Sequence, residues 1–125
     1  MATNPGYGPI VSEVVSAVLG PGRCFPDVPP DVPPSGSFVI YQNVGGVPSY
    51  FSEGAVADKR NARVQLSVWA TSPRTRYEVA DALLGAFAAR PETEPLTETI
   101  DDYEEILKLY GSRFDVAVWY PRFIP

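Results

Sequence analysis

The sequence predicts an α+β fold in which two helices pack on one face of an antiparallel sheet of about four strands. Segments 61–70 and 113–120 alternate apolar and polar side chains, as strands do. Segments 9–19 and 73–90 repeat apolar residues at helical spacing. The order is helix, strand, strand, helix and then one or more strands. Both apolar stripes are buried most simply when the helices share one face of the sheet.

The length and composition indicate one folded domain. The chain has 125 residues, and a domain usually has about 100–200. Hydrophobic residues make up 45% of it, an ordinary share for a globular protein. We therefore expect a single domain over residues 1–125, with a proline-rich connector at about 21–36.

The first helix is expected to run from about Pro9 to Leu19 and to end at Gly20 and Pro21. Proline suits the first turn of a helix, and glycine followed by proline commonly ends one. The apolar stripe comprises Ile10, Val11, Val14, Val15, Ala17 and Val18. The six prolines at 21–34 then restrict the backbone to an extended path. This segment is either a stiff loop along the domain or a docking arm for a partner.

The next elements are a strand at 37–44 and a long connection at 47–59 that has room for a short strand near 49–52. In the following strand, 61–70, the side chains of Val64, Leu66 and Val68 point to one face. Ser72 and Pro73 then open the second helix as N-cap and first residue. Its apolar face comprises Val79, Ala80, Leu83, Leu84 and Phe87.

The C-terminal third has weaker periodicity until its last strand. Residues 93–100 predict a weak strand or a loop, and 101–109 fit either a helix or a strand. In the last strand, 113–120, apolar residues alternate with Asp115, Ala117 and Trp119. The second face of the sheet is then expected to hold Gln65, Ser67, Trp69, Asp115, Ala117 and Trp119. Tryptophan is enriched at interface hot spots, so either another protein or a loop of this chain covers that face.

The residue types argue against catalysis and against cofactor or metal binding. The chain has no histidine and one cysteine, so the usual nucleophile–base pairs and Cys/His metal sites lack their components. Cys24 follows Arg23, whose positive charge would favour a thiolate. The sequence indicates no general base for it, so we expect a structural cysteine. The acidic run 101–105 lacks a calcium-loop pattern and is expected to be solvated surface.

The charge disfavours nucleic-acid binding, and the hydropathy argues against a membrane span. The net charge of -5 disfavours binding to a phosphate backbone, and no segment reaches the roughly 20 apolar residues of a membrane span. No signal peptide is expected, so the protein is made in the cytoplasm. Positive residues concentrate before the 61–70 strand and in the helix after it, where we expect them to share one rim. They are Lys59, Arg60, Arg63, Arg74 and Arg76.

Several segments resemble the tail terminator (tail completion) proteins of long-tailed phages and prophages. The resemblance begins with residues 38–50 (Phe-Val-Ile-Tyr-Gln-Asn-Val-Gly-Gly-Val-Pro-Ser-Tyr) and 62–70 (Ala-Arg-Val-Gln-Leu-Ser-Val-Trp-Ala). It continues with a helix that starts near Pro73 and with the closing 114–120 (Phe-Asp-Val-Ala-Val-Trp-Tyr). The proline-rich stretch 27–34 looks longer than is usual in that family.

The resemblance implies a virion assembly protein without enzymatic activity. Such a subunit forms a homohexameric ring that caps the tail tube, ends its polymerisation and meets the head–tail connector protein, while DNA passes through without specific binding. No cofactor and no membrane are implied. An alternative is a monomeric adaptor that binds proteins through its proline-rich loop. We expect the interfaces to use Arg60, Arg63 and Arg74 in salt bridges between subunits, and Trp69 and Trp119 as buried contacts.

Overall fold

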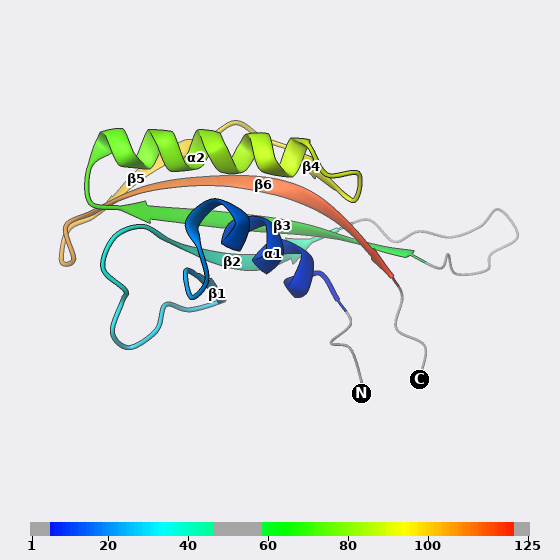
Figure 1. The fold of residues 1–125 in the computed structure, drawn as a ribbon, viewed down its shortest axis with the longest axis horizontal. Helices are drawn as coiled ribbons and strands as arrows, with labels where there is room; N and C mark the ends of the chain where they lie inside the picture. The colour runs from blue at the N-terminus through cyan, green and yellow to red at the C-terminus, as the bar shows by residue number, and fades with distance from the viewer. Residues whose placement is uncertain (1–5, 47–58, 122–125) are drawn as a thin grey trace, which may run out of the picture.

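The structure, a computed structural model, describes residues 6–46 and 59–121 and confirms the α+β class. Two helices accompany a six-stranded mixed sheet (Figure 1). The helices are α1 (Gly8–Leu19) and α2 (Pro73–Ala88). The strands are β1 (Cys24–Pro26), β2 (Phe38–Gly45), β3 (Lys59–Ala70), β4 (Thr93–Pro95), β5 (Ile100–Glu104) and β6 (Leu109–Pro121).

Two long antiparallel strands, β3 and β6, form the centre of the sheet. Their register runs without a break from Lys59 opposite Pro121 to Ala70 opposite Tyr110. The strand order is β1-β2-β3-β6-β4, and β5 also pairs with β6, beyond β4 along the same edge. Only β1 runs parallel to its neighbour in this described part of the chain.

The sheet therefore has more strands than the expected four, and it is not wholly antiparallel. Strand β1 was not predicted, and β4 is the strand in the segment 93–100, which was predicted as a weak strand or a loop. Each has three residues, too few for an alternating pattern to appear in the sequence. The ambiguous segment 101–109 contains no helix: it is strand β5 as far as Glu104, a turn at 105–108 and then the first residue of β6. The expected short strand near 49–52 lies outside the described residues.

Both helices lie on one face of the sheet, as predicted (Figure 1). α1 buries Val11, Val14 and Val15, whereas Ala17, which was expected in the stripe, is exposed. α2 buries Ala80, Leu83 and Phe87. Between helices and sheet lies a core of buried residues: Val11, Val14, Val15, Val39, Ala62, Val64, Leu66, Val68, Leu83, Phe87, Phe114, Val116, Val118 and Tyr120.

The ends of α2 follow the local chemistry of the sequence. The backbone N–H of Thr75 donates to the Ser72 side chain at 3.1 Å, so Ser72 is the N-cap. Beyond the C-terminus, Arg90 forms ion pairs with Glu13 of α1, at 3.0 Å, and with Glu92. These bonds raise the pKa of Arg90, the bond to Glu92 being the largest cause. Arg90 thereby links both helices and the approach to β4.

Neither α1 nor α2 is long and apolar enough to cross a membrane.

Candidate interaction surfaces

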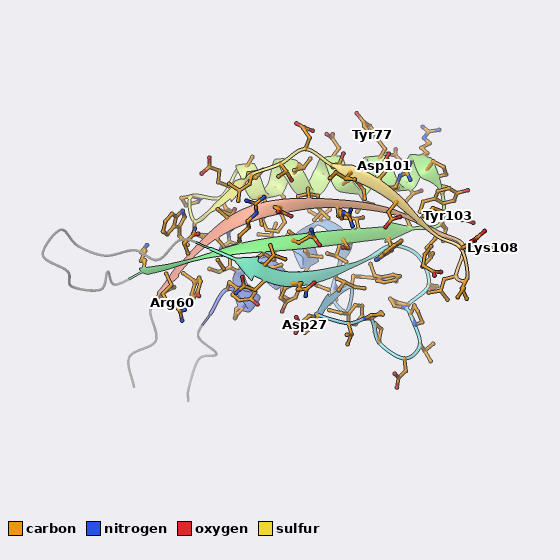
Figure 2. The ribbon with its side chains drawn as sticks, turned by 180° about the vertical axis from the view of Figure 1, so that it is seen from behind. Asp27, Arg60, Tyr77, Asp101, Tyr103 and Lys108 are labelled. Carbon is orange, nitrogen blue, oxygen red and sulfur yellow. The ribbon has the colours of Figure 1, made fainter. Side chains whose placement is uncertain are left out.

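The face of the sheet opposite the helices is open in this part of the chain. Figure 2 views the molecule from this side, and the strands lie in front of both helices. We call this surface the open face. It holds the predicted Gln65, Ser67, Trp69, Asp115, Ala117 and Trp119, together with Ile40, Gln42, Arg63 and Arg113. No helix among the described residues covers it; Arg63, Arg113 and Trp119 are exposed on it, whereas Ala117 is buried.

Trp69 is half-buried by its own sheet. It pairs with Phe38 on β2 and with Gly111 on β6. A Cβ atom added to Gly111 would lie 2.6 Å from the Cζ3 atom of Trp69, so the indole ring covers the glycine closely. Phe38 is buried and meets the ring of Phe25 edge-on at 6.3 Å between centroids. The indole of Trp69 is therefore fixed by contacts within the chain, and only part of it faces outward.

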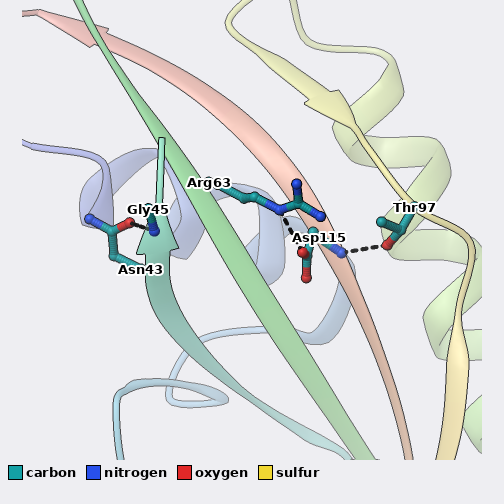
Figure 3. Close-up of polar contacts among 5 residues, drawn as sticks. All are labelled: Asn43, Gly45, Arg63, Thr97 and Asp115. Carbon is teal, nitrogen blue, oxygen red and sulfur yellow. Dashed lines mark hydrogen bonds and ion pairs between the residues drawn. The ribbon is translucent and has the colours of Figure 1, made fainter. Parts of the chain in front are cut away.

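Arg63 forms an ion pair inside the chain. Its Nε–H donates to Asp115 Oδ2 at 2.7 Å across β3 and β6 (Figure 3). The Asp115 backbone N–H in turn donates to Thr97 Oγ1 at 2.9 Å. The side chain of Arg63 is 46% exposed and that of Asp115 14%. A contact between Arg63 and a neighbouring subunit would have to compete with this pair.

A similar local bond shapes the end of β2. The Gly45 backbone N–H donates to Asn43 Oδ1 at 2.9 Å (Figure 3), where the register with β3 shifts between these two residues. Such an irregularity bends the strand and re-aims its side chains. The intervening Val44 is left exposed at this end of the sheet.

The basic residues do not share one rim, contrary to the expectation from the sequence. Lys59 and Arg60 begin β3, whereas Arg74 and Arg76 lie on α2, which starts after β3 has ended. A twelve-residue strand spans about 40 Å, which separates the two groups. Most of β3 lies between the two groups in the sequence, so residues with close numbers are far apart in the fold.

The arginines on α2 have acidic neighbours within the chain. Arg74 is almost fully exposed and lies 3.9 Å from Glu78, one turn further along the helix. Arg76 is more buried and pairs with Asp101 of β5 at 3.3 Å. Its guanidinium also lies 5.7 Å from the centroid of the Tyr110 ring. Arg76, which was not among the predicted interface residues, thus anchors β5 to α2.

The other end of the sheet holds Arg60 and Trp119, on opposite faces. In the register of β3 and β6, Asn61 lies opposite Trp119 and Arg60 opposite Tyr120. The guanidinium of Arg60 is 5.8 Å from the centroid of the Tyr120 ring. Trp119 is 39% exposed. Because Tyr120 belongs to the core, Arg60 lies on the face of the helices and Trp119 on the open face, so the structure does not bring these two predicted interface residues together.

Sequence reasoning missed the exposed apolar turn between β5 and β6. The sequence allowed a helix or a strand over 101–109, but Ile106 and Leu107 occupy the turn at 105–108 and are exposed. Nothing in the sequence indicated a turn here, because the segment Glu105 to Lys108 contains none of the residues that usually form turns.

The described residues offer no obvious reactive centre. Burial raises the pKa of Cys24 to about 12, which keeps its thiol protonated near neutral pH and agrees with a structural cysteine. No cluster of His, Cys, Asp or Glu suited to a metal ion occurs in residues 6–46 and 59–121. An open pocket of about 310 Å³ lies between α2 and the start of β5, and Arg76 and Asp101, which pair with each other, line it.

Comparisons with known proteins place this fold among phage components. The family model described as tail completion protein gp17 matches residues 10–120. A similar solved structure is a chain from the virion of a native gene transfer agent particle, with a TM-score of 0.60 and 17% sequence identity. The alignment covers 87% of this chain and 85% of that one, and it supports the fold. A comparison with curated proteins found no match.

Proposed function

Because the chain belongs to the tail completion protein gp17 family, we propose that it caps the tail tube of a long-tailed phage. Family membership gives it a structural role in a phage tail and a place in the virion. The finer assignment is that it ends polymerisation of the tube and forms part of the joint with the head. One observation supports this most: the family match extends from the first turn of α1 to the penultimate residue of β6, so it covers nearly the whole fold.

The proposed assembly is a homohexameric ring on the end of the tube. A ring forms when one surface of a subunit contacts a different surface of the next and the rotation closes. The open face and the exposed turn at 105–108 are two distinct surfaces that suit such contacts. The tail tube protein and the head–tail connector protein are the proposed partners on the two sides of the ring.

The charge of the chain fits a conduit for DNA. DNA that passes through a ring must not be held by it, and a net charge of -5 repels phosphate rather than binding it. The proposed role is mechanical: the ring stops the tube and joins it to the head. It needs no cofactor.

The open face is proposed as the surface that meets another tail protein. Trp69 and Trp119 both lie on it, and tryptophan contributes strongly where it becomes buried between proteins. Arg63 is a weaker candidate for such a contact, because it is already paired with Asp115. Arg74 remains a candidate for the subunit contact, because its side chain is exposed and its Nε atom lies 3.9 Å from Glu78 Oε2, a weak ion pair.

A phage in which this gene is deleted tests the proposal. Tubes without a cap are expected to exceed the normal length, and filled heads are expected to accumulate without tails. Electron microscopy of the lysate measures both, and the gene supplied on a plasmid should restore normal particles. Tubes of normal length joined to filled heads in the deletion strain would show that the chain does not terminate the tail.

A further inference from the structure

The segment that joins β1 to β2, residues 27–37, turns back over a distance much shorter than its length. Since β1 and β2 are parallel and Pro26 lies opposite Tyr41, the chain has to return only as far as Phe38, about 11 Å away. The segment contains four prolines in eleven residues. Prolines favour an extended path of about 3.1 Å per residue, or about 34 Å in all. The closed loop therefore opposes the preference of its own sequence.

Asp27, the first residue of this loop, has a strained conformation. Its φ angle is 64°, in the left-handed region that residues other than glycine seldom adopt. The Val28 backbone N–H donates to the Pro26 carbonyl at 2.7 Å, which closes a γ-turn centred on Asp27. γ-turns with a positive φ angle are rare and strained. The loop gains little burial in return, because Val28 is 68% exposed and Val32 83%.

The part of the chain before this loop is held by contacts with the rest of the domain. α1 buries three valines in the core, and its Glu13 pairs with Arg90 at 3.0 Å. β1 lies along residues 39–41 of β2. We call residues 8–26 the arm and residues 27–37 the hinge. The seat is the surface that receives the arm, formed by residues 39–41 and by α2 with Arg90.

A second copy of this chain offers an identical seat, and the structure shows that the arm fits it. If the arm of one copy docked in the seat of the next, every contact between arm and seat would form again, and only the hinge would differ. The hinge would then run between copies on the extended path that its prolines favour, and Asp27 would leave the γ-turn. Exchange of an identical element is a low-cost route to an oligomer, and a strained hinge invites it.

We propose that, in the assembled ring, the arm of each copy docks in the seat of the next copy, with the hinge extended between them. Each copy gives its arm to one neighbour and receives an arm from the other, as ring closure requires. The end of a tail tube holds the copies side by side, and this high local concentration offsets the entropy lost on association. The inference rests on the proposed function, because it names the contact that joins the subunits of the terminator.

The single cysteine of the chain makes such an exchange measurable. Cys24 on the arm lies opposite Val39 in the seat, and both side chains pack against the core. Neighbouring strands are about 4.8 Å apart, within the range of Cα separations that a disulfide needs. One chain keeps Cys24, and a second chain carries Cys24→Ser with Val39→Cys. Each then has one cysteine, so a disulfide between the two chains joins the arm of one to the seat of the other.

The two chains are co-expressed with different tags, because undocking a folded arm would expose its buried valines. They are then bound to tail tubes made without this chain and oxidised with diamide, and circular dichroism establishes that each chain folds. Non-reducing electrophoresis should show about half of the Cys24 chains linked to the second chain, because equal amounts give each arm an even choice of seats.

The matched control moves the new cysteine along the same strand. It carries Cys24→Ser with Val44→Cys, which places the thiol at an exposed position that β1 does not pair with. Chance collisions would link this exposed cysteine at least as readily as one at position 39. Docking of the arm would not reach it, so little linkage is expected.

Two glycine variants, each made in both linked chains, test the role of the hinge. Asp27→Gly relieves the left-handed strain of the closed loop, so the linked share should fall about threefold or more. Asp31→Gly is the matched control, because residues 26–29 and 30–33 have the same sequence, Pro-Asp-Val-Pro, and Asp31 has no positive φ angle. It should leave the linked share close to that of the parent pair.

Linkage no greater than in the Val44→Cys control, in solution and on tubes alike, would overturn this inference. Equal linked shares for the two glycine variants would also overturn it, since the hinge would then not drive the exchange. The proposed function is judged separately by tube length in the deletion strain. If unlinked chains cap tubes of normal length, the inference fails alone. If tubes have normal length without the chain, the proposed function fails.

Discussion

Replacing Gly111 by alanine tests the contact that fixes Trp69 on the open face. The new methyl carbon would lie 2.6, 2.9 and 3.0 Å from the Cζ3, Cε3 and Cη2 atoms of the indole ring. Carbon atoms prefer a separation of about 3.5–4.0 Å, so the ring must retreat by about 1 Å. Overpacking of this kind typically costs about 1–3 kcal/mol of the free energy of unfolding.

Two other effects of this substitution are small or absent. Gly111 does not have a positive φ angle, so alanine introduces no left-handed backbone strain. Loss of glycine also restricts the unfolded chain, which stabilises the fold by about 0.4–1 kcal/mol. The net expectation for Gly111→Ala is a loss of about 1–2 kcal/mol, measured by urea unfolding followed by far-ultraviolet circular dichroism.

The same substitution in a Trp69→Ala background is the control. Without the indole ring the methyl group meets no obstacle, so Gly111→Ala should then be neutral or stabilising by up to about 1 kcal/mol. The two backgrounds should differ by more than about 1 kcal/mol, as expected for residues in direct contact. An equal cost in both backgrounds would refute the account, because the obstacle would then be something other than Trp69.

Three further results are expected. Phe87→Ala should lower the free energy of unfolding by about 3–5 kcal/mol in urea, since Phe87 is fully buried and meets Phe114 edge-on; a loss below about 1 kcal/mol would contradict this position in the core. Burial raises the pKa of Cys24 from 9.0 to about 12, so the unfolded chain releases the thiol proton first. Stability should therefore fall as the pH rises from 9 towards 12, and Cys24→Ala should flatten that fall in urea titrations; an unchanged slope would count against it. In tail incorporation assays, Trp69→Ala should reduce binding more than Arg63→Ala, because an exposed ion pair contributes about 0–1 kcal/mol and an interface tryptophan about 2 or more. The reverse order would contradict the role of the open face.

Much of the fold was predictable because its signals are local. The alternation in 61–70 and 113–120 specified which side chains of β3 and β6 face the core, and the structure buries that set. Ser72 caps α2 as predicted, since an N-cap depends only on the next few residues. The helices share one face because two apolar stripes and one sheet have few other ways to be buried.

The candidate surfaces were only partly predictable. The sequence indicated the composition of the open face, including both tryptophans, but not that Trp69 covers Gly111 or that Arg63 pairs with Asp115. It also placed all five basic residues on one rim, whereas β3 separates Arg60 from Arg74. Charged residues that are close in the sequence can lie at opposite ends of a strand, and the sequence pattern of charges does not show this separation.

By itself, the sequence determined the class of the fold, the faces of the long strands, the N-cap of the second helix and the family resemblance. Only the tertiary structure decided that 100–104 is a strand, that the apolar turn at 105–108 is exposed, and that Arg63 meets a carboxylate 52 residues away. The physical reason is the range of the interactions. Helical spacing and capping act within a few residues, whereas strand pairing and ion pairs depend on partners that only the folded chain brings together.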